Sequence, residues 1–300
     1  MRKTSIGILM ACLCATALAQ TNSENAASVS ADNLKRGLVL HFDFDSPPNG
    51  DKVIDLSGDG NDGQAVNIQW TADGHQGGGM QFGLSNSYIA VPNNASLNPP
   101  QYTLCAWIRT SYQDGIFRRL IDKGCGDYDL TMAGDTSKGR YLRGRVAFQP
   151  GSNWVSCSTI VADGQWHHCV GVFNGRILRL YLDGHLRWSA FKKGGCASFG
   201  YDLTIGANRH PISVYDQMNA SLNGALDDVM IYNRALSGPE VRALFESQGG
   251  VWVDLPPPAN SAPSRPSAAD RLKELESLYQ QGLINQDDYK RKKKEILDSL

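Results

Sequence analysis

Short runs of alternating apolar and polar residues recur along most of this chain, and they favour an all-β architecture. In the first run, residues 38–45, leucine and phenylalanine occupy the even positions, while His41, Asp43 and Asp45 occupy odd ones. Alternation with a period of two residues is typical of a half-buried β-strand. We therefore predict a strand that ends in carboxylates.

The pattern returns in later segments and is joined by turn signals. Strand-like runs cover residues 102–109, 145–148, 167–173 and 176–182. Asn174-Gly175 and Asp183-Gly184 separate the last runs, and both dipeptides suit the two-residue type I′ turn of a hairpin. These turns predict an antiparallel meander from Trp166 to about Trp188. Many short strands at this spacing indicate a sandwich or jelly roll.

One helix is predicted within this β region. Ser237 can serve as N-cap and Glu240 completes a capping box, while Pro239 fits the first turn and Gly249 ends the helix. Val241, Leu244 and Phe245 share one face, so the helix should pack on the sandwich.

The N-terminus carries the pattern of an export signal. Arg2 and Lys3 precede an apolar stretch and an Ala17-Leu18-Ala19 cleavage site, which predicts a signal peptide at residues 1–19. We expect a periplasmic or secreted protein. The alternative is a lipoprotein anchored at Cys12. Residues 20–34 are small and polar and are expected to be disordered. No later segment is apolar and long enough for a transmembrane helix.

Export makes disulfides expected for the five cysteines that remain. Cys157 and Cys169 flank Asp163-Gly164 symmetrically, which would place them opposite each other if the flanking strands pair. Cys125 and Cys196 occur in similar sequence contexts and form a second predicted pair. Cys105 lies inside an apolar strand, where a buried free thiol is the simplest interpretation.

The composition changes at the C-terminus. Residues 254–269 are rich in proline and predict a stiff linker. Residues 270–300 predict a small helical hairpin, which is too short to bury a core of its own. We expect it to self-associate or to dock on another protein. Its lysine run is balanced by acidic residues, and the whole chain has a net charge of −1, so a nucleic-acid partner is not expected.

The β region resembles the laminin G-like jelly roll of the concanavalin A-like lectin/glucanase superfamily. The resemblance rests on the run at 38–45, the Gly/Asp-rich loop at 55–63, the Trp-His-His-Cys-Val stretch at 166–170 and the Leu-Asp-Asp-Val stretch at 226–229. It implies an antiparallel two-sheet jelly-roll sandwich at residues 35–253 with one short surface helix. Residues 270–300 resemble the bacterial short C-terminal domain, whose usual role is assembly, and this implies a bacterial source.

The same resemblance implies a structural calcium ion. Asp45, Asn61 and Asp227 are the matching ligands, with Asp43 and Asp55 as weaker candidates. Calcium takes six to eight oxygen ligands in loose geometry, which suits such a set. The alternative is that these side chains only stabilise turns.

Catalysis is not expected from the residues present. Glucanases of the superfamily use paired glutamates, but no glutamate occurs between Glu24 and Glu240. Adjacent His167 and His168 would point to opposite faces of a strand and cannot chelate one metal ion together.

We therefore predict an exported binding module that recognises carbohydrate or a protein surface. The alternatives are a structural or adhesive protein that binds only proteins and, third, a polysaccharide hydrolase. Four aromatic residues in loop-like surroundings are candidates for stacking on sugar rings: Trp70, Tyr112, Trp154 and Tyr215.

Overall fold

The computed structural model describes residues 29–83, 85–112, 117–124, 127–133, 145–150, 155–156, 159–191, 200–207, 209, 220–255, 272, 275–276, 279 and 286–298. The chain divides into two compact units, residues 1–252 and 253–300. Across the described residues, no helix is long and apolar enough to cross a membrane.

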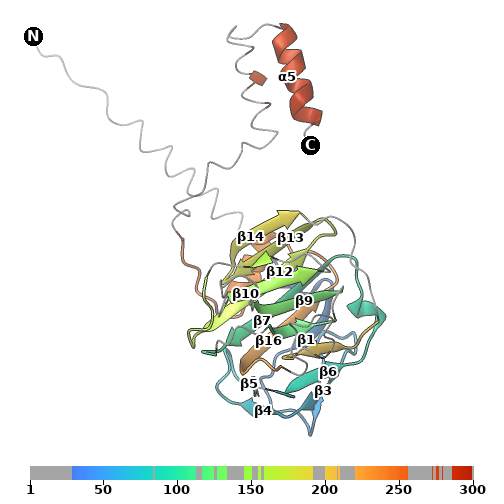
Figure 1. Cartoon of the computed structure of the whole chain (residues 1–300), viewed down its shortest axis with the longest axis vertical. Helices are drawn as coiled ribbons and strands as arrows, with labels where there is room; N and C mark the ends of the chain where they lie inside the picture. Colours follow the sequence, from blue (N-terminus) through green and yellow to red (C-terminus); the bar gives the residue numbers. More distant parts are fainter. Residues whose placement is uncertain are drawn as a thin grey trace, which may run out of the picture. The chain divides into compact units, whose positions relative to one another are not determined.

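The first unit is a sandwich of two antiparallel sheets, as predicted (Figure 1). One sheet, here sheet A, has the order β14-β13-β12-β7-β16-β5-β4, and β1 also pairs with β16. Its strands are β1 Leu38–Phe42, β4 Ile68–Thr71, β5 Gly79–Phe82, β7 Tyr102–Arg109, β12 Trp166–Phe173, β13 Ile177–Leu182, β14 His185–Phe191 and β16 Gly224–Tyr232.

The other sheet, sheet B, has the order β11-β10-β9-β8-β15-β6-β3-β2. Its strands are β2 Lys52–Val53, β3 Gly63–Val66, β6 Tyr88–Val91, β8 Arg118–Asp122, β9 Tyr128–Ala133, β10 Arg145–Pro150, β11 Val155–Ser156 and β15 Leu203–Ile205. A short 3-10 helix, η1, spans Ala95–Leu97.

Two apolar clusters hold this unit together. The larger cluster combines residues of both sheets, such as Leu104 and Leu226 of sheet A with Ile121 and Leu130 of sheet B. The smaller cluster joins Cys105 and other residues of sheet A to helix α3, Gly238–Ser247. This helix begins at the predicted capping box of Ser237 and Glu240. Its buried residues are Val241, Leu244 and Phe245, so the predicted packing face is confirmed.

The β12–β13–β14 meander is confirmed, although only one of its turns has the predicted type. Asp183 and Gly184 have φ values of 52° and 75°, as a type I′ turn requires. Asn174 does not have a positive φ. Its side-chain oxygen instead accepts hydrogen bonds from the backbone N–H groups of Arg176 and Ile177. The first turn is therefore one residue longer than predicted.

Residues 31–34, which we expected to be disordered, belong to helix α2, Ala31–Lys35. Ser30 caps the helix, and Leu34 packs against the smaller apolar cluster. Arg234 also donates a hydrogen bond of 2.7 Å to the carbonyl of Asn33. These contacts with the domain explain why the segment is helical, although its composition predicts disorder.

In the second unit, helix α5 spans Gln286–Asp298. Leu275 is buried, and the rings of Tyr279 and Tyr289 stack with their centroids 4.8 Å apart. The predicted second helix of the hairpin is present. Of the first helix, only isolated helical positions fall within the described residues.

Candidate functional site

Strand β16 changes its neighbour at Asp227 and Asp228. Residues 224–226 pair with β5, whereas residues 229–232 pair with β1. The register against β7 also shifts between Asp227 and Met230, and Asp228 has a φ of 46°. This irregularity turns two adjacent carboxylates into the gap between β1 and β5.

The Asp227 carboxylate fastens the loop that precedes β5. Its Oδ2 accepts hydrogen bonds from the backbone N–H groups of His75 at 2.8 Å and Gln76 at 3.1 Å, and its Oδ1 accepts one from Asp228 at 2.8 Å. Asp227 is fully buried, and burial together with the nearby charge of Asp228 raises its pKa to about 7. The three backbone N–H groups therefore stabilise the negative charge of Asp227 only in part.

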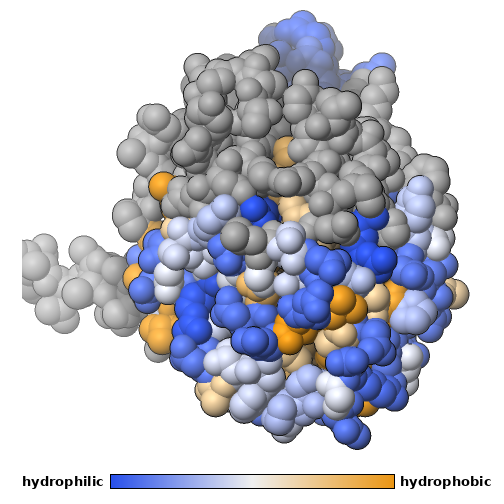
Figure 2. Space-filling view, turned by 60° about the horizontal axis from the view of Figure 1, so that its bottom comes forward, coloured by the Kyte–Doolittle hydropathy of each residue, from blue (hydrophilic) through white to orange (hydrophobic). Residues whose placement is uncertain are grey.

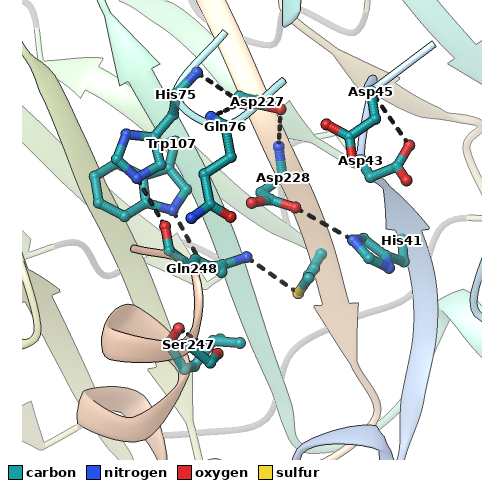
Figure 3. Close-up of polar contacts among 12 residues, drawn as sticks. His41, Asp43, Asp45, His75, Gln76, Trp107, Asp227, Asp228, Ser247 and Gln248 are labelled. Carbon is teal, nitrogen blue, oxygen red and sulfur yellow. Dashed lines mark hydrogen bonds and ion pairs between the residues drawn. The ribbon is translucent and has the colours of Figure 1, made fainter. Parts of the chain in front are cut away.

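Asp43 and Asp45 approach the same loop from the end of β1 (Figure 3). The backbone N–H of Asp45 donates to Asp43 at 3.3 Å. The Asp45 carboxylate lies so close to Gly77 that a Cβ at this glycine would collide with it. His41 Nε2 lies 3.4 Å from Asp228 Oδ1. The structure therefore brings Asp45 and Asp227 to a single loop.

Asn61 and Asp55 belong to a different network. Asp55 accepts hydrogen bonds from the backbone N–H groups of His41, Ser57 and Asn61 and from the Ser57 hydroxyl. Asn61 donates to the carbonyl of Val39 at 2.6 Å, near the start of β1, whereas Asp45 follows its end. Both side chains hold the loop at 55–62 against β1.

The donor chemistry around Asp45 and Asp227 fits calcium, because both residues offer hard carboxylate oxygens beside uncompensated negative charge. In the part of the chain that the structure describes, no three His, Cys, Asp or Glu side chains are grouped closely enough to hold a metal ion. Backbone carbonyls or water would have to complete the coordination. Asp55 fits less well, since its two oxygens already accept four hydrogen bonds.

An aromatic stack lies beside this loop. The His75 ring stacks on Trp107 with centroids 3.4 Å apart, and Trp107 in turn contacts His168 and Phe245. Gln248, which follows α3, accepts from Trp107 Nε1 at 3.1 Å. Trp107 is only 2% exposed, so the stack closes the sheet against the helix instead of offering an open binding surface.

His167 and His168 point to opposite faces of β12, as expected. His167 bonds to Asp183 at 2.9 Å and to Asp163 at 3.2 Å, and the bond to Asp183 is the largest influence that raises its pKa. His168 is fully buried, and among the residues that the structure describes neither ring nitrogen has a hydrogen-bond partner. Burial lowers the pKa of His168 to about 3.

Two of the four predicted sugar-stacking residues are described, and both are engaged within the fold. Trp70 packs against the larger apolar cluster and donates from Nε1 to the carbonyl of Phe44 at 2.8 Å. The Arg118 guanidinium lies 4.9 Å from the centroid of the Tyr112 ring. Trp154 and Tyr215 lie outside the described residues.

The predicted disulfides are not tested, because Cys157, Cys125 and Cys196 lie outside the described residues. The hairpin expected around Asp163-Gly164 is not formed: β11 pairs with β10 in sheet B, whereas β12 pairs with β7 and β13 in sheet A. Cys169 is fully buried. Cys105 is a buried free cysteine, as its sequence context indicated, and burial raises the pKa of its thiol.

Sequence reasoning missed a pair of carboxylates in sheet B. Asp122 of β8 lies directly opposite Asp129 of β9, and Arg119 lies 3.9 Å from each of them. Asp122 and Asp129 are 2% and 3% exposed. Only the pairing of two strands brings them together, so no local sequence pattern could have revealed them.

Exposed side chains of the β13–β14 hairpin were also missed. Leu186, Trp188 and Phe191 of β14 are 52%, 53% and 62% exposed. Elsewhere, one face of the molecule shows small hydrophobic groups between mostly hydrophilic residues (Figure 2). The sequence signal was present, because the alternation of a strand continues through residues 185–191, but a strand pattern does not show which strand lies at a sheet edge.

Comparisons with known proteins agree with this architecture. The binding domain of Paraclostridial Mosquitocidal Protein 1 is 20% identical over 71% of this chain, with a TM-score of 0.55. Domain 4 of AbnA, an extracellular arabinanase from Geobacillus stearothermophilus solved in complex with arabinotriose, is 17% identical over 69% of this chain and 97% of its own, with a TM-score of 0.53.

Botulinum neurotoxin type C, whose cell entry depends on interaction with two ganglioside molecules, is 16% identical over 73% of this chain, with a TM-score of 0.54. The chain covers 53% of each of the two toxin structures, about half of their length. At these identities the likeness concerns the fold alone. No curated protein matches the sequence significantly.

Two family profiles match the sequence. The short C-terminal domain matches residues 270–297. The profile of the concanavalin A-like lectin/glucanases superfamily matches residues 82–242, which is more than half of the chain. The chain therefore belongs to the concanavalin A-like lectin/glucanases superfamily, and a short C-terminal domain follows its jelly roll.

Proposed function

We propose that the jelly roll is a non-catalytic module that binds carbohydrate. The observation that carries this proposal is the exposure of Leu186 and Phe191, which share one face of β14, the edge strand in the order of sheet A, while Trp188 is exposed on the other face. Large apolar side chains that gather on a surface usually mark an interaction site. Aromatic rings suit the apolar faces of sugar rings, while neighbouring polar groups can bind hydroxyls.

Structural relatives support this proposal. The arabinanase domain was solved with arabinotriose, and the botulinum neurotoxin interacts with gangliosides. Both share the sandwich fold with this chain at low sequence identity. Because a fold hosts many functions, the argument rests first on the exposed side chains of this chain and only second on the relatives.

Calcium is a second part of the proposal. An ion beside Asp45 and Asp227 would compensate the buried charge of Asp227 and would fix the loop at 72–78 between β1 and β5. Asp43 and Asp228 lie close by and could add further oxygens. The role of the ion would be structural, because the described residues around it offer no nucleophile with a base.

The hydrolase alternative has one observation in its favour, the Asp122–Asp129 pair. Residues directly opposite on antiparallel strands have Cβ atoms about 5 Å apart, and retaining glycosidases need carboxyl groups at roughly that spacing. Both carboxylates are buried, however, and Arg119 ties them into one ion-pair cluster. A substrate could not reach them without opening of the structure, so we favour binding.

Export and assembly complete the proposal. The N-terminal pattern supports a signal peptide, with a lipid anchor at Cys12 as the alternative. The short C-terminal domain would then bring several jelly rolls together or dock them on a partner protein. Weak sugar sites would gain avidity from such assembly.

The test is to incubate the purified protein with a set of polysaccharides and to measure retention and reducing-end release in the same tubes. Retention without release is the expected result. Release above the blank that is lost in Asp129→Asn would establish the hydrolase instead. Binding to protein surfaces with no retention of any polysaccharide would favour the structural or adhesive alternative.

A further inference from the structure

Three arginines in or directly before the β13–β14 hairpin have no acidic partner among the described residues. In other parts of the chain, Arg109 pairs with Asp73 at 2.9 Å and Arg242 pairs with Glu246 at 2.9 Å. Within the described residues, no carboxylate lies within 4.0 Å of the guanidinium groups of Arg176, Arg179 and Arg187. Unpaired arginines gathered on one element are a feature that folding alone does not explain.

The register places Arg179 on the same face of the hairpin as the exposed side chain of Phe191, and Trp188 on the opposite face. Arg179 lies opposite Ser189 and Ile177 lies opposite Phe191, so Arg179 and Phe191 share one face of the hairpin. The Arg176 guanidinium lies 5.1 Å from the centroid of the Phe191 ring. Trp188 lies opposite Leu180, which belongs to the larger apolar cluster. Trp188 itself is more than half exposed, because β14 is at the edge of the sheet.

Arg187 occupies an irregular position. The register shifts between Leu180 and Tyr181, so that Leu186 pairs with Tyr181 and Trp188 pairs with Leu180, which leaves Arg187 without a residue opposite. Its Nε is buried and has no hydrogen-bond partner among the described residues. Because this nitrogen is buried, a bound polymer could not reach it, and Arg187 adds to the site only through its charge.

Residues 176–191 contain three arginines and one aspartate, so this segment has a net charge of +2 in an otherwise balanced chain. Its one acidic residue, Asp183, already accepts hydrogen bonds from the His167 ring and from the backbone N–H of His168. The whole chain has a net charge of −1. A local cluster of one sign attracts ligands of the opposite sign.

We propose that the β13–β14 hairpin binds an anionic polysaccharide, one that carries carboxylate or sulfate groups. This inference rests on the proposed carbohydrate-binding function and names both the class of glycan and the site. Phe191 contacts the faces of sugar rings, while Arg176 and Arg179 donate charge-assisted hydrogen bonds to the acidic groups. β14 is the edge strand in the order of sheet A (Figure 1).

The experiment measures the affinity of the full-length protein for four polymers at low and high salt. Polygalacturonate and alginate carry carboxylates, heparin adds sulfates, and arabinan is neutral. We expect binding to the anionic polymers that weakens at least tenfold from 50 to 500 mM NaCl, because salt screens the arginines. The comparison of polygalacturonate with heparin then identifies the acidic group.

Variants locate the site. Arg176→Gln and Arg179→Gln should each lower affinity for the anionic polymers by about threefold to tenfold. Arg179→Lys, which keeps the charge, should lose less. Arg36→Gln is the matched control, since it removes one exposed positive charge outside the hairpin. Thermal unfolding of each variant separates loss of binding from loss of the fold.

Three outcomes would overturn the inference. Equal binding of arabinan and polygalacturonate, with no effect of the Arg176 and Arg179 variants, would disprove it and would leave the carbohydrate-binding function standing. A change of oligomeric mass in Phe191→Ala, without any change in polymer binding, would show that β14 pairs with a second copy instead. Absence of binding to all four polymers would contradict both the inference and the proposed function.

Discussion

Asp227 and His75 are 152 residues apart in the sequence, yet Asp227 Oδ2 accepts a hydrogen bond of 2.8 Å from the His75 backbone N–H. Through this bond the middle of β16 holds the loop that precedes β5.

The first prediction concerns the pH dependence that Asp227 imposes. Its folded pKa of about 7 exceeds the usual value of 3.8, so the folded protein binds the proton more tightly. The contribution of this group to stability is therefore fully present below pH 4 and is lost as the pH rises to 7. The stability of the wild type relative to Asp227→Asn should fall by roughly 2–4 kcal/mol between pH 4 and pH 7. Urea unfolding at a series of pH values, with exposed Asp59→Asn as control, measures this difference.

Calcium should reverse that trend, because a nearby cation favours the charged carboxylate. A ligand at a hundredfold excess over its Kd stabilises the fold by about 2.7 kcal/mol. A chelator should therefore lower the Tm by several degrees, and Asp227→Ala should abolish this sensitivity. Asn61→Ala should keep it, since Asn61 belongs to the separate network. An identical melting curve with and without chelator would rule calcium out.

His168 should make the protein sensitive to acid. Its pKa of about 3 lies below the unfolded value of 6.5, so its contribution to stability is lost as the pH falls below 6.5. Replacement by phenylalanine removes two buried nitrogens that have no hydrogen-bond partner within the described part of the chain, and His168→Phe should stabilise the protein by about 1 kcal/mol at pH 7 and by more at pH 5. Chemical denaturation at both values tests this. Destabilisation at pH 5 would indicate that the ring nitrogens do have partners.

His167 should behave in the opposite way. Its hydrogen bonds to Asp183 and Asp163 raise its pKa, so it stabilises the fold below pH 6.5 and loses this effect as the pH rises through the folded pKa. His167→Gln should cost about 1 kcal/mol at pH 6 and less at pH 8. An NMR titration of the wild-type ring checks the direction of the shift directly.

The C-terminal unit should change the mass of the protein in solution. Light scattering on the full chain and on a chain that ends at Asp254 should give different numbers of protomers per particle if residues 270–300 self-associate. Because α5 is highly charged and Leu297 is 48% exposed, a partner surface is needed to cover its apolar residues. Equal masses would leave docking on another protein as the surviving form of the proposal.

The elements that sequence alone predicted well are those whose signals are local. The strand at 102–109 and the capping box at Ser237 were recovered because neighbouring residues determine them. The first strand ends earlier than its alternation suggests, because Phe44 adopts a φ of 54°. The expected Asp163-Gly164 hairpin is absent because the two flanking strands belong to different sheets: β11 pairs with β10, and β12 pairs with β7 and β13.

The candidate site was only partly predictable, because it depends on contacts between distant segments. Family resemblance identified Asp45 and Asp227, which the structure brings to one loop, but it grouped them with Asn61 at the other end of β1. Neither the Asp122–Asp129 pair nor the unpaired arginines of the hairpin has a local sequence signature. Both follow from strand order, which residue patterns do not specify.

The pairing of β1 with β16 has a consequence for how the domain forms. Leu38 lies opposite Tyr232, so the first strand of sheet A is completed by the last one. Long-range pairings of this kind slow folding, because the chain loses the entropy of closing a large loop before the contacts between the strands contribute any stability. During synthesis, β1 emerges from the ribosome long before its neighbour exists. Until Tyr232 has been made, β1 cannot form this pairing, and its apolar side chains remain available for contacts with the rest of the nascent chain or with other proteins.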